Sequence, residues 1–338
     1  MADCVETPTG VRLGLLKKIL AEFPKAERAT LTSAQLVERH VKPATAARRC
    51  RYVEVLAGGD VGAHEVFVSH AWARPFRHIV AALDEHWAAL SKRARNAKFV
   101  WLDMFAVNQH QGETTQADLA RLPQRIAQAR QTVLLLYDDG LPLRRIWCLF
   151  EILHTARLAD GAERLHVMSH DADLNELVEV YNTVDVASAQ ATNAADVDKI
   201  LALVKEEMNE YCAMNRFIRE ALLASARAEV ARAERVAPAG VATAKTINKL
   251  ASILEHMGQF EEVEALYKKA IGIAEQNKRD HPAFVATCKH NYADYLRRVG
   301  RYEEAAAMFK EALEVDIAVY GDKHPSVATT KSCIASVL

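Results

Sequence analysis

The stretch EVFVSHAWARPFRHIVAALDEHWAAL, residues 65–90, joins a short apolar run to an amphipathic segment. Its first six residues, EVFVSH, contain β-branched and aromatic side chains and end in two polar residues, which predicts a buried strand. In the segment FRHIVAALDEHWAAL the apolar residues recur at helical spacing. The stretch therefore indicates a strand followed by a helix.

The same alternation continues along the chain. Further short apolar runs end in polar residues: KFVWLD (98–103), TVLLLYDD (132–139), ERLHVMSH (163–170) and, more weakly, TVDVASA (183–189). Strands separated by helices are typical of a parallel sheet with helices on both faces. We therefore expect an α/β domain over residues 61–198, preceded by a helical N-terminal extension over residues 1–60.

The composition excludes several classes of function. The 338 residues carry 43 basic and 44 acidic side chains, so no net field attracts nucleic acid or anionic lipid. No apolar run approaches the roughly 20 residues that a membrane span needs, and the first residues do not resemble a signal peptide. Six cysteines without a CxxC pair favour reduced thiols over disulfides or zinc. We expect a cytoplasmic protein that binds neither nucleic acid nor membrane.

The last third of the chain contains an internal repeat. A charged, alanine-rich helical linker over residues 199–240 precedes it. In residues 241–338, the segment LASILEHMGQFEEVEALYKKAI aligns with YADYLRRVGRYEEAAAMFKEAL. The alignment pairs Gly258 with Gly300, so the repeat has a period of 42 residues. We expect helical hairpins in which alanines allow close crossing and Phe260 and Tyr302 fill the spaces between helices. Two units are full, and a third is truncated within its first helix, which suggests a fragment that lacks further repeats.

These units resemble tetratricopeptide repeats, in the lengthened variety of kinesin light chains, whose units end in a loop with His-Pro, here RDHP and GDKHP. The resemblance implies an all-α solenoid that binds a protein or peptide in a groove lined by the first helix of each unit. The matching groove positions are Asn248, Ser252, His290, Asp294, Arg297 and Arg298.

A single carboxylate stands out in RIWCLFEIL, residues 145–153. On a helical wheel Trp147, Glu151 and His154 share a narrow stripe beside a broad apolar face. The segment follows a predicted strand, so it borders the carboxyl ends of the parallel strands, where ligands of such sheets bind. The polar residues at those ends are Ser69, His70, Asp103, Asp138, Asp139, Ser169 and His170.

Five segments follow one another in an order that resembles the Toll/interleukin-1 receptor (TIR) domain: VFVSH, VWLD, FAVNQHQGETT, IAQARQTVLLLY and WCLFEI. The resemblance is to a variety of this domain with SHAW and WCLFE that is found in algae and other protists. The resemblance implies a flavodoxin-like α/β fold that self-associates or signals. In TIR domains that hydrolyse NAD+, a glutamate on this helix is catalytic, and Glu151 matches it. The expected contacts to the dinucleotide are Ser69, His70, Trp72, Asp103 and Trp147.

Two functions follow as hypotheses. One is an interaction and signalling scaffold, with a ligand on the repeats and self-association through the TIR-like domain. The other is an NAD+ glycohydrolase that needs no resident cofactor, because NAD+ is its substrate. A metal site made of His70, His110 and Asp103 is a weaker alternative, since their spacing matches no known ligand pattern. We expect no metal.

Overall fold

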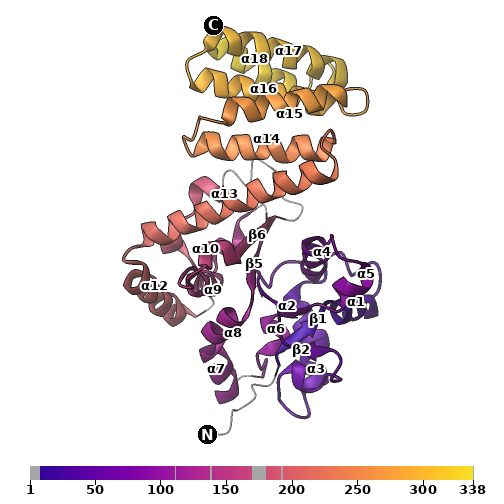
Figure 1. Cartoon of the computed structure of the whole chain (residues 1–338), viewed down its shortest axis with the longest axis vertical. Helices are drawn as coiled ribbons and strands as arrows, with labels where there is room; N and C mark the ends of the chain where they lie inside the picture. The colour runs from indigo at the N-terminus through magenta and orange to yellow at the C-terminus, as the bar shows by residue number, and fades with distance from the viewer. Residues whose placement is uncertain (1–7, 111, 138, 170–179, 192, 338) are drawn as a thin grey trace. The chain divides into compact units, whose positions relative to one another are not determined.

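A computed structural model describes residues 8–110, 112–137, 139–169, 180–191 and 193–337. The chain divides into two compact units, Met1–Ala221 and Leu222–Leu338, with the boundary inside helix α13 (Tyr211–Val236). The first unit contains the sheet, and the second is helical (Figure 1). The expected order of an α/β domain followed by a helical repeat region is therefore confirmed.

Within the described residues, the sheet contains four strands that pair in parallel and, on one side of them, two further strands that are joined by antiparallel pairing. Its order is β2-β1-β4-β3-β5-β6, in which β3 pairs in parallel with β4 and β5, and β5 with β6. The strands are β1 (Gly10–Arg12), β2 (Val61–Gly62), β3 (Val66–Ser69), β4 (Phe99–Trp101), β5 (Gln131–Leu136) and β6 (Leu165–Ser169). The four parallel strands match the four stronger apolar runs of the sequence.

The N-terminal segment is not purely helical, because β1 joins the sheet. Val11 lies antiparallel beside Val61 of β2 and Val100 of β4. Only three residues long, this strand is too short to show an alternating pattern, and the sequence GVRLGLLKKIL reads as one helix. The N-terminal segment therefore covers the edge of β4, which would otherwise leave backbone groups unpaired.

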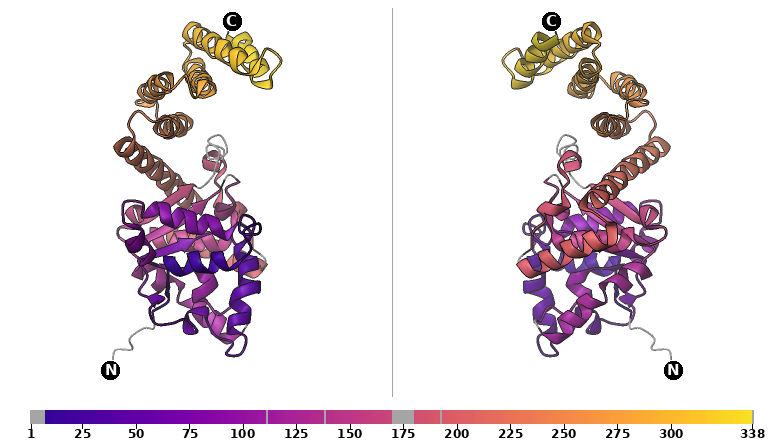
Figure 2. Two further views of the ribbon diagram at one scale, coloured as in Figure 1. Left: turned by 90° about the vertical axis from the view of Figure 1, so that its right-hand side faces the viewer. Right: turned by 90° about the vertical axis from the view of Figure 1, so that its left-hand side faces the viewer.

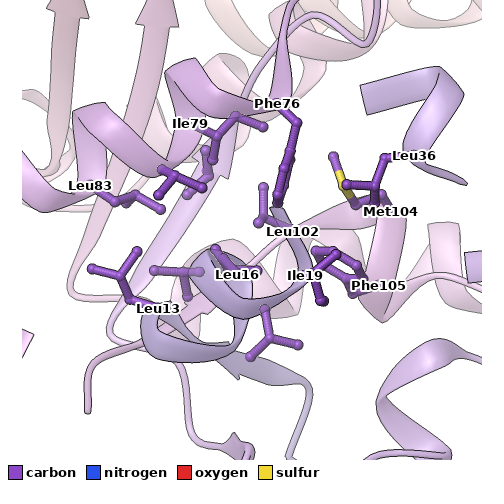
Figure 3. Packing of buried hydrophobic residues seen from close by; sticks show 14 of the residues in the cluster. Leu13, Leu16, Ile19, Leu36, Phe76, Ile79, Leu83, Leu102, Met104 and Phe105 are labelled. Carbon is purple, nitrogen blue, oxygen red and sulfur yellow. The ribbon is translucent and has the colours of Figure 1, made fainter. Parts of the chain in front are cut away.

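Successive residues of each parallel strand face opposite sides of the sheet. Val66 and Val68 pack with helices α1 (Leu13–Glu22) and α4 (Phe76–His86) in one buried cluster. Figure 3 shows the side chains that these two helices contribute, from Leu13 and Leu16 on α1 to Phe76 and Ile79 on α4. Each fully buried side chain of this kind stabilises the fold by about 2 kcal/mol.

The opposite face belongs to a second cluster. There Phe67 stacks on Trp101 with ring centroids 4.5 Å apart, and both pack against helix α8 (Leu122–Gln128). Helix α9 (Ile146–Ala156) adds Trp147 and Phe150 to the margin of this cluster. Because both faces are covered, the strands are apolar throughout, as the sequence shows.

Shorter elements complete the first unit. They are α2 (Ser33–Leu36), a π-helical turn (Val37–Val41), α3 (Lys42–Thr45), α5 (Lys92–Asn96), α6 (Asp103–Ala106), α7 (Glu113–Ala120), α10 (Gly161–Arg164), α12 (Ala194–Met208) and 3-10 turns at Tyr52–Glu54, Leu141–Arg144 and Val186–Ser188. The weak strand expected over residues 183–189 is wrong. A turn forms there because the Asp185 side chain accepts a hydrogen bond from the Ala187 amide.

The second unit consists of successive helical hairpins, shown in orange to yellow in Figure 2. Its helices after α13 are α14 (Val241–His256), α15 (Val263–Gln276), α16 (Pro282–Arg298), α17 (Tyr302–Tyr320) and α18 (Pro325–Val337). Gly258 and Gly300 end α14 and α16 with φ of 69° and 81°, a left-handed conformation that favours glycine. The amides of Gln259 and Arg301 then bond to carbonyls five residues back, at 3.0 and 2.9 Å. The turn geometry therefore repeats with the predicted period.

The predicted packing of the hairpins is only partly correct. The alanines expected at close crossings, such as Ala251 and Ala293, are fully buried. Phe260 and Tyr302, however, are 44% and 54% exposed, so they do not fill the space between helices. The left-handed glycine turn directs these residues outward, and the buried aromatic ring belongs to a position seven residues later, Tyr267 in the first repeat.

Candidate functional site

A pocket of about 230 Å³ lies at the carboxyl ends of the parallel strands. The strand order shows that the chain moves from β3 to β4 on one side and then to β5 on the other, and ligands of such sheets bind where the order reverses. Helix α9 follows β5 and forms one wall. The lining residues are His70, Trp72, Asp103, Leu119, Leu122, Arg145, Trp147, Cys148 and Glu151.

The structure brings most of the predicted residues together. Glu151 and four of its five expected neighbours, His70, Trp72, Asp103 and Trp147, line this pocket. Ser69 does not line it, but it lies fully buried at the end of β3 close enough to affect the Glu151 carboxyl. Their roles toward a ligand stay predictions.

Other strand-end residues lie elsewhere. Asp139 forms an ion pair with Arg74 instead of lining the pocket. Asp138 and His170 lie outside the described residues.

Sequence reasoning missed four lining residues. Leu119 and Leu122 look like ordinary core residues in sequence, and nothing in their spacing sets them apart. Arg145 immediately precedes α9, and this position beside the strand end could have identified it. Cys148 packs in the interior: its thiol is buried and donates a hydrogen bond to the His70 carbonyl at 3.5 Å. Burial raises the pKa of the thiol, so Cys148 is a poor nucleophile.

Glu151 is buried, contrary to the expected polar stripe outside the core. Only 8% of the residue is exposed, because it lies in the pocket with residues that follow β3 and β4. Burial, assisted by the negative charge of Asp103, raises the pKa of Glu151 to about 8, while the Ser69 hydroxyl acts in the opposite direction. Near neutral pH this carboxyl is therefore mostly protonated.

Asp103 fixes one wall of the pocket. Its Oδ2 accepts a hydrogen bond from Trp72 Nε1 at 2.6 Å, and its Oδ1 accepts one from the Met104 amide at 2.7 Å. Gln109 Nε2 donates to the Asp103 carbonyl at 3.0 Å. The carboxylate thus joins the loop after β3 to the loop after β4 and holds the Trp72 indole against the pocket.

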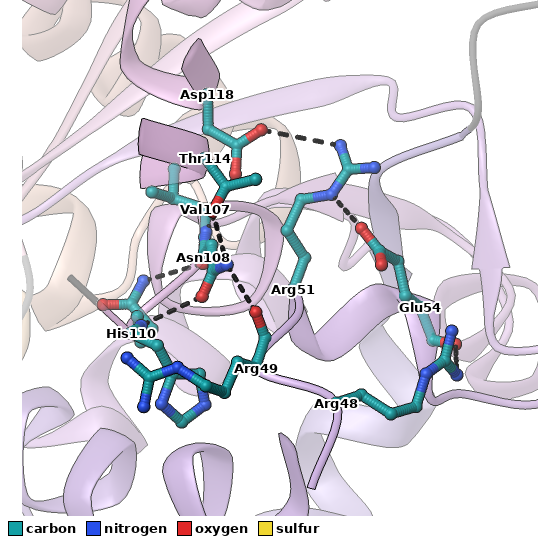
Figure 4. A network of polar contacts seen from close by, with 10 residues as sticks. Arg48, Arg49, Arg51, Glu54, Val107, Asn108, His110, Thr114 and Asp118 are labelled. Atoms are coloured by element: carbon teal, nitrogen blue, oxygen red, sulfur yellow. Dashed lines mark hydrogen bonds and ion pairs between the residues drawn. The ribbon is translucent and has the colours of Figure 1, made fainter. Parts of the chain in front are cut away.

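The loop after β4 is held by the N-terminal segment, as Figure 4 shows. Asn108 Nδ2 donates to the Arg49 carbonyl at 2.7 Å and to Thr114 Oγ1 at 3.1 Å, and the Asn108 amide donates to Asp118 Oδ2 at 3.0 Å. Asn108 is 3% exposed, so these bonds satisfy groups that have little access to water. The N-terminal segment therefore supports the pocket wall as well as the sheet edge.

The alternative metal site is not assembled. His110 Nε2 lies 2.9 Å from Thr45 Oγ1 and does not line the pocket that holds His70 and Asp103. Among the residues that the structure describes, no group of three or more His, Cys, Asp or Glu side chains could hold a metal ion.

The predicted groove residues of the second unit divide by burial. Asn248 and Ser252 are buried, at 1% and 9% exposure, whereas the open face of α16 carries polar side chains. There Asp294 pairs with Arg297 at 2.7 Å and with Arg298 at 3.3 Å. Arg298 also lies 3.1 Å from the buried Glu255. His290 instead packs inside the unit, with its Nδ1 3.4 Å from Oγ1 of the buried Thr330 and its ring against Phe309.

Comparison with known families identifies the repeats. A model of the tetratricopeptide repeat family matches residues 242–318 and 284–337. No curated protein matches the chain. None of the helices in the described ranges combines the length and apolar character that crossing a membrane requires.

Proposed function

We propose that this chain is a protein-interaction scaffold in which the repeats bind a protein or peptide and the α/β unit, as a TIR-like domain, self-associates or signals. The match of residues 242–337 to tetratricopeptide repeats carries the proposal. Arrays of helical hairpins present extended surfaces for protein partners. The alternating charges of Asp294, Arg297 and Arg298 on α16 suit a polar, charged peptide better than an apolar one.

Charge substitution on α16 tests the scaffold role. In a pull-down, Arg297→Gln with Arg298→Gln should lose specific partners that the wild type retains. Lys310→Gln with Lys323→Gln removes the same charge from exposed positions outside the first helices and should leave those partners bound. Thermal melts of all variants exclude loss of folding. If the partners bind both double variants equally well, Arg297 and Arg298 do not belong to the binding groove.

A second candidate function is hydrolysis of NAD+ by the α/β unit, favoured by the position of Glu151 in the strand-end pocket. Cleavage of the bond to nicotinamide leaves an oxocarbenium-like ribose, which a carboxylate stabilises. The Trp72 and Trp147 indoles offer flat walls for a base, and Arg145 offers a cation for a phosphate.

The protonation of Glu151 sets the expected pH dependence of this reaction. A carboxyl with a pKa of about 8 is active as carboxylate only at higher pH, or when the positive pyridinium of NAD+ favours its ionised form. For the free enzyme, kcat/KM should therefore rise with pH up to about 8.

The deciding assay follows nicotinamide released from NAD+ by purified protein, dilute and deliberately clustered, because self-association is expected to complete the site. The hydrolase is supported if the wild type releases nicotinamide, Glu151→Ala does not, and the control Glu163→Gln, at an exposed position, still does. Absence of turnover in clustered wild type would leave the scaffold function alone.

A further inference from the structure

The N-terminal segment after α1 forms backbone hydrogen bonds with the loop after β3. The amides of Ser33 and Ala34 donate to carbonyls of that loop, both at 3.1 Å. In the opposite direction, the Phe76 amide at the start of α4 donates to the Leu31 carbonyl at 2.8 Å. These bonds fix the loop, which carries one wall of the strand-end pocket, to the N-terminal segment.

The same segment also holds the loop after β4. Thr45 Oγ1 lies 2.9 Å from His110 Nε2 of that loop. The Arg49 carbonyl accepts a further hydrogen bond from the loop at 2.7 Å (Figure 4). Residues 31–52 therefore connect the two loops, and we call this segment the strap.

His40 fastens the middle of the strap to other elements of the first unit. Its Nε2 lies 2.6 Å from the Tyr52 hydroxyl, and its Nδ1 lies 3.3 Å from Glu22 Oε2 on α1. The Tyr52 ring packs against Phe105 of α6, with ring centroids 5.3 Å apart. One imidazole thus links α1, the strap and the helix that follows β4.

This contact is formed by a neutral imidazole. Burial lowers the pKa of His40 below its ordinary value of 6.5, against the opposing effect of the Glu22 carboxylate. The carboxylate favours the ring proton on Nδ1, which leaves Nε2 as an acceptor. Burial, with the charges of Glu22 and Asp60, raises the pKa of Tyr52 to about 12, so its hydroxyl remains a donor to Nε2. A second proton on the ring occupies Nε2 and removes this bond.

The charged groups on the same turn as His40 pair with other residues. The Arg39 guanidinium lies over the Phe23 ring, 5.0 Å from its centroid, and pairs with Glu27 at 2.8 Å. Lys42 pairs with Glu38. Among the described residues, the carboxylate on α1 is therefore the charge that acts on the imidazole.

We propose that the strap is a regulatory device, which holds the loops after β3 and β4 together and which mild acid loosens at His40. Apolar anchors such as Leu36 and Val41, at most 1% exposed, keep the strap on the core. Acid therefore raises the frequency of local opening and does not expel the segment. Each opening frees both loops, so the pocket walls respond to pH. This regulation requires neither a partner of the repeats nor a reaction with NAD+.

Hydrogen exchange of individual amides in the full chain tests the strap. The amides of Ser33, Ala34 and Phe76 are the reporters, because each donates across the contact with the loop after β3. Because the pKa of His40 is lowered in the folded chain, its stabilisation is present above pH 6.5 and lost below it. After correction for intrinsic exchange, protection of the reporters should fall several-fold per pH unit below 6.5, and at most about tenfold for one titrating group.

Two substitutions should change this pH dependence in opposite directions. His40→Gln keeps a polar side chain that does not titrate, so the fall in protection should disappear. Glu22→Gln removes the charge that favours the protonated ring, so the fall should become larger. Glu22 is exposed, so this variant keeps the test decisive if His40→Gln folds poorly. His281→Gln, at an exposed position of the second unit, should behave like the wild type.

The Leu134 amide in β5 separates local opening from unfolding of the whole unit, and it should stay better protected than the reporters. Equal protection of Leu134 and the reporters would overturn the proposal. So would wild-type protection that does not change in acid, the same fall in His40→Gln, or a smaller fall in Glu22→Gln. Loss of protection at Ser33 and Ala34 without loss at Phe76 would show that the strap does not hold the loop, and would also overturn it.

Discussion

The stability of the first unit should depend on pH partly through Glu151, and Glu151→Gln should remove that part. The folded chain keeps the Glu151 proton up to a pH of about 8, whereas the unfolded chain releases it near the ordinary pKa of 4.5. Between these values the folded state binds one more proton, so the free energy of unfolding falls by about 1.4 kcal/mol per pH unit. The stabilisation is complete below pH 4.5 and lost as the pH rises through 8.

The magnitude is large enough to measure. Between pH 6 and pH 8 the wild type should lose about 2 kcal/mol that the variant does not lose, because glutamine has no proton to release. Subtracting the two profiles cancels the titrating groups that do not interact with Glu151. Tryptophan fluorescence during denaturation reports the first unit alone, since all four tryptophans lie there, at positions 72, 87, 101 and 147.

A control separates the buried carboxyl from carboxyl groups in general. Glu163→Gln removes an exposed carboxylate outside the pocket, and its profile should run parallel to that of the wild type. If the profile of Glu151→Gln also runs parallel to that of the wild type between pH 6 and pH 8, the carboxyl is ionised throughout and the description of the pocket is incorrect.

Three further substitutions test individual hydrogen bonds of the first unit and one glycine turn of the second. Trp72→Phe keeps a ring at the pocket wall but removes the 2.6 Å bond to Asp103, and should lower the stability of the first unit by about 1–3 kcal/mol in denaturant titrations. Asn108→Ala should cost a similar amount, because it removes the hydrogen bonds that the buried Asn108 side chain donates to the Arg49 carbonyl and Thr114 Oγ1; an unchanged midpoint would show that water replaces them. Gly300→Ala should destabilise the repeats by about 1–2 kcal/mol, from backbone conformation alone, since no atom lies within 4 Å of the added methyl group; helical circular dichroism melts measure it.

Sequence patterns predicted the features that depend on periodicity. The four parallel strands, the helices between them and the 42-residue repeat follow from the spacing of apolar residues and from Gly258 and Gly300. The pocket residues at the strand ends were predictable because the carboxyl ends of parallel strands meet at one edge. Five predicted residues therefore meet in one pocket although they come from three separate segments.

What periodicity could not predict depends on tertiary contacts. A three-residue strand such as β1 carries no pattern of its own, and its partner β4 lies almost ninety residues away. The helical wheel placed Glu151 on a polar stripe, but its burial depends on residues distant in sequence, because it lies in one pocket with His70 and Trp72 after β3 and Asp103 after β4. The exposure of Phe260 and Tyr302 likewise follows from the conformation of the glycine turn rather than from the aromatic character of these residues.

Infrared difference spectroscopy of the Glu151 carboxyl, with and without nicotinamide, shows directly whether this side chain is a neutral acid that faces a ligand. At neutral pH we expect a protonated carboxyl band that is present in the wild type, absent in Glu151→Gln, and shifted when nicotinamide binds. A wild type that shows only ionised carboxylate, or a protonated band that nicotinamide leaves unchanged, would contradict a neutral carboxyl that faces a ligand pocket.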